Sequence, residues 1–245
     1  MIRFITSIAI ALAITALFVL FHKQVHKRSH LIYIAAAVIT AYIIGAGMMH
    51  ATGSWPQWFS TNIASTINQG ALAVAVFVMV MYVGVLPKKW RLTRRLIYVR
   101  AELSIIGCIL SLGHNANYAN LFVQLFTDPM SMRGNGLYAV ASIDSLILIA
   151  LMIPLMITSF YSVRKLFTAK KWKSLQKWSY VFYVGLYVHA ALIFWTAISG
   201  GHHAAASTDS LIAYSIFFIP YFVLRPLKYL LDKRAHAPVG EEGLI

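Results

Sequence analysis

The sequence predicts an all-α membrane protein: a polytopic bundle of seven transmembrane helices, with the N-terminus outside and the C-terminus in the cytoplasm. Its 245 residues are 60% hydrophobic and only 11% charged, and the mean hydropathy is +0.71. Such a composition is typical of membrane proteins and excludes an ordinary soluble domain. Of the 21 Lys and Arg residues, all but Arg3 and Arg133 lie in four clusters in the loops between apolar segments or at the ends of these segments, within 23–28, 88–100, 164–177 and 225–234. This positive-inside pattern sets the predicted orientation.

The net charge of +14 does not indicate a nucleic-acid partner, because the basic residues follow the loops of the predicted topology. We expect membrane lipid as a partner, no nucleic acid, and a multi-pass location in a bacterial cytoplasmic (inner) membrane. The single cysteine, Cys108, lies inside an apolar segment. It excludes both a disulfide and a thiolate metal site within one chain.

The first apolar segment, at about residues 4–21, is predicted to be a retained helix rather than a cleaved signal peptide. It ends in Phe21-His22-Lys23 instead of a small-residue cleavage site. The basic loop that follows it is expected in the cytoplasm. Residues 1–30 are therefore assigned to an extra N-terminal transmembrane helix and its loop.

Six further segments form the predicted core, residues 31–232, and a cytoplasmic tail follows at 233–245. The loops on one side of this core carry the basic clusters. The loops on the other side carry little charge and include Trp55 and Trp58, as in an outer interfacial belt. No Gly-rich phosphate loop follows a strand pattern, so a fused nucleotide-binding domain is not expected. The expected segments are about 31–50, 67–86, 97–120, 137–162, 172–203 and 209–231.

One strongly polar side chain, His189, lies near the middle of the apolar stretch at 172–203. An imidazole inside a bilayer is costly unless it is paired or metal-bound. Gly185 lies one turn earlier on the same helical face and leaves room for a bulky group. His114 lies in the segment at 97–120, which runs in the same direction, and Gly107 and Gly113 offer similar room there.

The spacing of these residues predicts two levels in the membrane. Arg100 precedes His114 by 14 residues, and Gln176 precedes His189 by 13. Because 14 residues of helix span about 21 Å, Arg100 and Gln176 share an inner level and the two histidines share an outer one. Two facing imidazoles from neighbouring helices can ligate one six-coordinate haem iron. Taken alone, His189 is equally well explained as a neutral histidine bonded to a neighbouring carbonyl.

The same residues carry a family resemblance. Trp172-x-x-Leu175-Gln176-x-x-x-Tyr180, followed by His189, resembles the fifth core helix of the ferric reductase-like transmembrane domain. Arg100 and His114 are similar to the arginine and ligand histidine on the third core helix of one member, the haem-binding membrane subunit of the bacterial periplasmic methionine sulfoxide reductase system. NADPH oxidases are more distant members. The resemblance covers segments two to seven and implies a haem b held by His114 and His189.

One position departs from the family pattern. The fifth core helix of the family usually has a second histidine at the position of Gln176, and an amide is a poor haem ligand. The resemblance therefore supports one haem b and does not support a second, inner haem at the level of Arg100 and Gln176.

Two carboxylates lie within apolar segments. Asp144 either bonds a neighbouring helix or relays protons near a quinone site, and a quinone is a candidate second cofactor. Glu102 is a candidate for the same relay and lies close enough in sequence to pair with Arg100.

Three histidines, His50, His202 and His203, are expected at the outer face. Imidazoles suit transition metals, so they are candidates for a metal site. Interfacial histidines without a function are the alternative.

These features favour a b-type cytochrome membrane subunit of an oxidoreductase system. It would carry electrons from a quinol or a separate flavoprotein through haem to an extracytoplasmic acceptor, which is a redox partner protein or a metal complex. Two other classes stay open. One is an ion- or proton-coupled transporter that uses intramembrane Asp, Glu and His, although no inverted repeat is obvious. The other is a non-catalytic membrane scaffold, in which His114 and His189 are replaceable.

Overall fold

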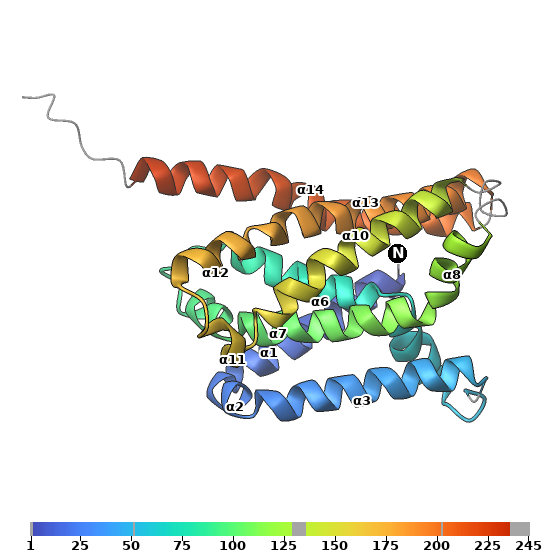
Figure 1. Cartoon of the computed structure of the whole chain (residues 1–245), viewed down its shortest axis with the longest axis horizontal. Helices are drawn as coiled ribbons and strands as arrows, with labels where there is room; N and C mark the ends of the chain where they lie inside the picture. Colours follow the sequence, from blue (N-terminus) through green and yellow to red (C-terminus); the bar gives the residue numbers. More distant parts are fainter. Residues whose placement is uncertain (1, 51, 129–135, 202, 236–245) are drawn as a thin grey trace, which may run out of the picture.

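The computed structural model describes residues 2–50, 52–128, 136–201 and 203–235, and within these ranges the chain is helical, without strands (Figure 1). This agrees with the predicted all-α class. The helices are α1 (Ile2–Leu20), α2 (His22–Lys27), α3 (Ser29–Met48), α4 (Gln57–Phe59), the π-helix η1 (Ser60–Ala64), α5 (Ser65–Asn68), α6 (Ala71–Val83), α7 (Arg91–Asn117), α8 (Ala119–Thr127), α10 (Gly136–Ile157), α11 (Tyr161–Arg164), α12 (Ala169–Gln176), α13 (Trp178–Ser199) and α14 (Ala204–Ala235).

Five helices in the described ranges are long and apolar enough to cross a membrane, and a sixth span results if one bent pair of helices counts as one. These helices make the chain an integral membrane protein of the helical-bundle class. The apolar part of α1, Phe4–Leu20, is shorter than the other spans. The structure thus supports the coarser prediction, a polytopic helical bundle, with five to six candidate spans.

Helix α6 forms the centre of the bundle, and eleven of its residues are buried. It packs against α7, α1 and α14, so elements from both ends of the chain cover it. A helix that is apolar all round is expected to be buried in this way. Its Phe77 ring lies where a side chain at Gly107 of α7 would be, which lets these two helices approach closely.

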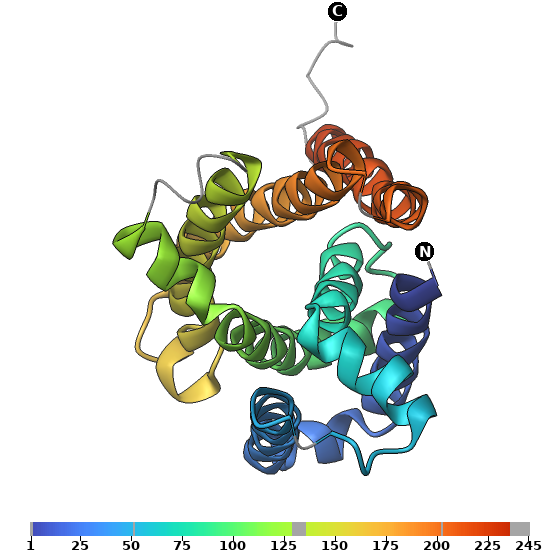
Figure 2. The ribbon, with the colours of Figure 1, turned by 90° about the vertical axis from the view of Figure 1, so that its right-hand side faces the viewer.

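The remaining long helices lie on two sides of this centre (Figure 2). Helix α3 packs on α7, where a methyl group of Thr40 occupies the space beside Gly113. On the opposite side, α13 packs chiefly against α10 and α14. Consequently α7 and α13 are held in place mainly by other helices rather than by extensive packing against each other.

The segment before α6 is broken, which the sequence pattern does not predict. The helical stretch Gln57–Asn68 and α6 meet at an angle of 65°. Gly70 at the break has φ of +72°, in the left-handed region that favours glycine. At the break the N–H of Gly70 donates to the carbonyl of Ile67, and the carbonyl of Asn68 is free to accept from a side chain.

Short helices lie at both ends of the bundle (Figure 1). At the basic end, α12 is anchored to the end of α10, because the indole nitrogen of Trp172 donates to the carbonyl of Thr158 over 2.9 Å. The guanidinium of Arg164 stacks over the Trp172 ring at 4.1 Å. At the other end, the predicted segment 97–120 divides at Tyr118 into α7 and the short α8. The predicted segment 97–120 therefore ends earlier than hydropathy suggests.

Candidate functional site

His114 lies near the end of α7 and faces the break before α6. Its Nδ1 lies 2.8 Å from the backbone carbonyl of Asn68. Since a carbonyl only accepts, Nδ1 carries the proton, and in the neutral ring Nε2 keeps its lone pair. The ring also lies directly against Gly70, where an added Cβ would be 2.9 Å from its Cγ. The break and the glycine together fix both the position and the tautomer of this imidazole.

His189 lies on α13 beside the carboxylate of Asp144 on α10. The distance from Nδ1 to Oδ2 is 3.6 Å, longer than a hydrogen bond, and both atoms are buried without a hydrogen-bond partner in the described residues. The backbone carbonyl of Ala141 also lies near the ring. The nearby carboxylate favours a proton on Nδ1, and in a neutral ring this tautomer keeps the lone pair on Nε2.

The two imidazoles lie within electrostatic range of each other. Nδ1 of His114 is bonded to the Asn68 carbonyl, so Nε2 is the nitrogen of this ring that is suited to a metal. An imidazole whose Nδ1 faces a backbone carbonyl or a carboxylate, with Nε2 left free, has the usual arrangement of a metal-ligating histidine. Because α7 and α13 are spaced mainly by other helices, a planar group between them would not disrupt a tight helix pair. Two imidazoles are the donor type that haem iron takes, so the chemistry of the two side chains is compatible with this cofactor.

The glycines that were expected to make room for a macrocycle do not leave open space. Phe77 lies against Gly107, Thr40 against Gly113 and Leu148 against Gly185. Each glycine lets a neighbouring helix approach, which is the ordinary use of small residues in membrane bundles. The prediction of room beside these glycines is therefore wrong.

The structure places the two predicted inner-level residues in different surroundings. Arg100 on α7 interacts with the hydroxyl of Tyr183 on α13. The Gln176 amide instead donates to Oγ1 of Thr158 over 3.2 Å, at the end of α10. Gln176 thus serves to attach α12 to α10, and the structure does not bring it together with Arg100.

Glu102 has a different partner from the one expected. Its Oε1 lies 2.7 Å from Nδ1 of His26 on α2, and not near a guanidinium of Arg100. The Glu102 side chain is buried, whereas the His26 side chain is 46% exposed. The pair ties the basic helix α2 to α7 and contacts neither candidate haem ligand.

The predicted outer metal site is not assembled within the described part of the chain. His50 follows α3 and His203 precedes α14, both with positive φ, and these helices lie on opposite sides of the bundle (Figure 2). His202 lies outside the described residues. No group of three or more His, Cys, Asp or Glu side chains with metal-binding geometry occurs among the residues described.

Sequence reasoning missed the partners of the histidines. The Asn68 carbonyl, Gly70 and the contact between Asp144 and His189 all depend on tertiary structure. The contact between Asp144 and His189 did leave a signal in the sequence. Asp144 and His189 lie on adjacent antiparallel helices, at roughly similar distances from the ends that face away from the basic loops. Comparison of depths between these two segments would have suggested the pair.

Comparisons with known proteins add one relative. A protein of Treponema pallidum (strain Nichols), described as uncharacterized, is 30% identical over 209 residues, which cover 85% of this chain and 56% of that protein. The chain thus spans about half the length of this relative. No family model matches the sequence, and no solved structure matches it significantly. The resemblance to the ferric reductase-like domain therefore stays a prediction that rests on the residues quoted above.

Proposed function

We propose that the chain is a b-type cytochrome membrane subunit in which His114 and His189 are the axial ligands of one haem. The observation that carries this proposal is the paired arrangement of the two imidazoles. They come from separate helices, lie within electrostatic range, and each directs Nδ1 to an acceptor. A bound haem would supply one-electron transfer.

The residues around the two ligands have distinct roles in this proposal. The Asn68 carbonyl holds the Nδ1 proton of His114 and so orients its lone pair. Asp144 favours the same tautomer in His189 and increases the basicity of the ring. Buried apolar residues of α6 and α7 keep water from this part of the bundle. Arg100 and Gln176 are not assigned as ligands.

The proposed direction of electron flow follows from depth. His114 is 23 residues from the start of α7 and three from its end. A site at this level lies near the face of the membrane away from the basic loops. We propose that electrons enter from a quinol or a separate flavoprotein on the basic, cytoplasmic side and leave to an extracytoplasmic protein or metal complex.

The test is an absorbance spectrum of the purified protein with haem quantitation. The proposal predicts a red protein with a Soret band and about one haem per chain. His114→Ala and His189→Ala should each abolish the band or shift it to a high-spin form, while the protein stays in the membrane. His22→Ala is the matched control, because this histidine lies at the basic end, away from the pair. A colourless wild-type protein, or two variants with the wild-type spectrum, would reject the assignment in favour of the transporter or scaffold.

The proposed topology has seven spans with the N-terminus outside. It is supported by the confinement of basic residues to alternate loops. Reporter fusions after residues 60, 130 and 205 should be extracytoplasmic, and fusions after 90, 168 and 240 cytoplasmic. Inversion at two of these sites would contradict the orientation, and the argument from depth would fail with it.

A further inference from the structure

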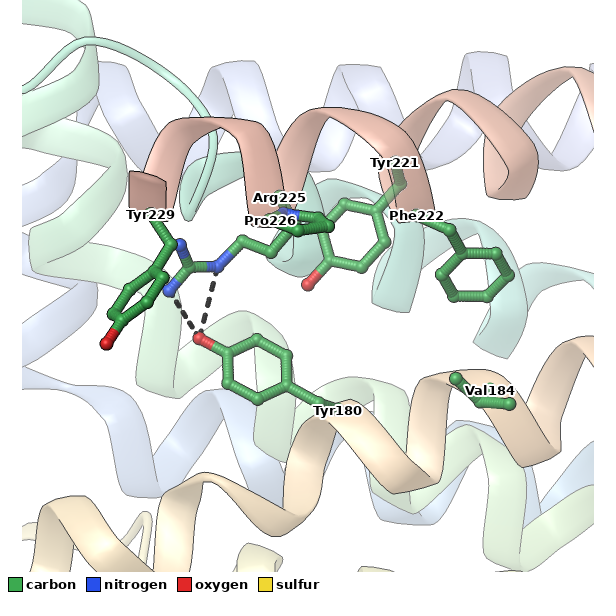
Figure 3. Close-up of a pocket in the computed structure, with 7 residues that line it drawn as sticks. All are labelled: Tyr180, Val184, Tyr221, Phe222, Arg225, Pro226 and Tyr229. Carbon is green, nitrogen blue, oxygen red and sulfur yellow. Dashed lines mark hydrogen bonds between the residues drawn. The ribbon is translucent and has the colours of Figure 1, made fainter. Parts of the chain in front are cut away.

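An apolar groove lies between α13 and α14 toward the basic end of the bundle, on the part of α13 that precedes His189 (Figure 3). Its volume is about 280 Å³, just below the size of pockets that enclose a drug-sized ligand. It is suited to part of a larger molecule. The groove is lined by Tyr180, Val184, Tyr221, Phe222, Arg225, Pro226 and Tyr229.

The only formal charge among the lining residues is that of Arg225. Its Nε donates to the Tyr180 hydroxyl over 3.1 Å, and Nη2 donates to the same oxygen (Figure 3). A guanidinium has five N–H donors, so one neutral hydroxyl satisfies only part of its capacity. Figure 3 shows the side chain directed across the groove from α14 toward α13.

A second guanidinium lies nearby. Arg100 interacts with Tyr183, and Arg100 and Arg225 both act electrostatically on Tyr221, which lines the groove. Neither arginine forms an ion pair with a carboxylate in the described part of the chain. Two cations beside one apolar groove are unfavourable without a counterion, because charges at the membrane boundary are costly unless paired.

The described carboxylates do not supply this counterion. Glu102 pairs with His26, Asp144 lies beside His189, and Asp232 pairs with Lys228. Asp128 and Asp209 belong to the opposite end of the bundle. Glu241 and Glu242 lie outside the described residues. A bound molecule with a negative charge and an apolar part would supply the counterion and also fit a groove open to the bilayer, since Val184 and Tyr229 are 49% and 61% exposed.

We propose that this groove binds one anionic phospholipid, with its headgroup phosphate on Arg225 and part of an acyl chain between Val184 and Phe222. Anionic lipids are attracted to basic membrane faces, and basic pockets between transmembrane helices bind their headgroups. The guanidinium matches a phosphate with two parallel hydrogen bonds. A neutral quinone would leave the charge uncompensated, and a free phosphate would leave the apolar walls exposed. The site is independent of the haem proposal.

The test is native mass spectrometry of the delipidated protein with added phosphatidylglycerol, phosphatidylcholine or inorganic phosphate. The wild-type protein should retain one phosphatidylglycerol and bind phosphatidylcholine about tenfold more weakly, because the choline cation beside the phosphate of phosphatidylcholine cancels the net negative charge that attracts the two arginines. Arg225→Ala should lower phosphatidylglycerol retention about tenfold as well. Lys228→Ala is the control, because it removes the same charge from the same helix outside the groove, where Lys228 pairs with Asp232.

A second variant guards against a folding defect in Arg225→Ala. Val184→Phe fills the groove from an exposed position and keeps every charge, so it should also reduce phosphatidylglycerol retention. Equal binding of the two lipids, an equal loss in Lys228→Ala, or unchanged retention in Val184→Phe would each overturn the proposal. Binding of inorganic phosphate as tight as that of the lipid would identify an anion site instead, and displacement of the lipid by a short-chain quinone would identify a quinone site.

Discussion

The two candidate ligands differ in how the protein holds them. His114 makes a 2.8 Å hydrogen bond to a backbone carbonyl at a break in a neighbouring segment, and its ring lies against Gly70. His189 has no hydrogen bond on Nδ1 and lies 3.6 Å from the Asp144 carboxylate. The first imidazole is positioned by main chain and the second by a side chain. A backbone contact resists substitution of any single side chain, whereas a carboxylate contact can be removed by one change.

Because of this difference, the position of a ligand ring can be tested at His114, and the charge beside a ligand ring can be tested at His189. At His114, the environment can be altered only by moving the backbone or the glycine. At His189, the charge of Asp144 can be removed while its shape is kept. Variants near His114 should therefore lose bound haem and stability, whereas a variant of Asp144 beside His189 should change haem affinity and midpoint potential.

The largest effect should come from Gly70→Ala. Alanine at φ of +72° costs about 1–2 kcal/mol, and its Cβ would lie 2.9 Å from Cγ of His114. Because the ring is also held by the Asn68 carbonyl and would have to move away from both, we expect loss of most bound haem and a lower melting temperature. Soret absorbance per protein and thermal unfolding measure both.

Gly185→Ala is the matched control for this variant. Its Cβ would also lie 2.9 Å from a neighbour, but that atom is Cδ2 of Leu148, the end of a flexible side chain. A rotation of Leu148 can relieve the contact, so haem content should stay near the wild-type value. If both glycine variants lose haem equally, the special role of the break at Gly70 is wrong.

An intermediate effect is expected from Asp144→Asn. Loss of a partner that orients a ligating histidine typically costs about 10- to 100-fold in metal affinity, and we expect haem affinity to fall at the low end of this range. The midpoint potential should rise, because the neutral amide stabilises the oxidised iron less than a carboxylate does. Haem titration and redox potentiometry measure these changes.

Glu102→Gln serves as the control for Asp144→Asn. It neutralises another buried carboxylate that pairs with a histidine, His26, which is not a proposed ligand. Haem affinity and potential should not change in this variant. A similar shift in both variants would indicate a general effect of charge in the bundle and not a contact with His189.

The smallest effect should come from Gln176→His. The family resemblance suggests that an imidazole at this position would create an inner haem site. In the structure the Gln176 side chain is directed to Thr158 on α10, whereas Arg100 contacts Tyr183. We therefore expect the ratio of haem to protein to stay near one. A ratio near two would show that α12 can turn its side chains toward the bundle.

The helical class could be predicted from the sequence, because it follows from local hydropathy and periodicity. The shared level of His114 and His189 rests on helix rise and stays a prediction. The sequence did not predict the helical stretch Gln57–Asn68 or its bend at Gly70, since this stretch is rich in Ser, Thr, Asn and Gln and hydropathy does not detect a bend. It also misjudged Gly107, Gly113 and Gly185, because a small residue leaves space only if no neighbouring helix fills it. Which side chain fills that space is a property of the tertiary packing.

The partner of Glu102 shows the same limit. Proximity in sequence suggested Arg100, two residues away, but residues two apart on a helix point in different directions. His26, 76 residues away, is the partner because α2 folds back onto α7. Such contacts arise from chain topology and cannot be obtained from spacing along one helix.

The central position of α6 has a consequence for assembly in the membrane. The first helix, α1, and the last, α14, both pack on α6, and their Phe4 and Tyr214 rings stack with centroids 3.9 Å apart. The two helices nearest the ends of the described chain therefore pack side by side on the same helix, α6. While the chain is being inserted, α6 has α1 and α7 as neighbours but only lipid where α14 will lie. The bundle is completed by its last helix, and a chain that stops before α14 would leave this face of α6 and the Phe4 side chain open to lipid or to another copy.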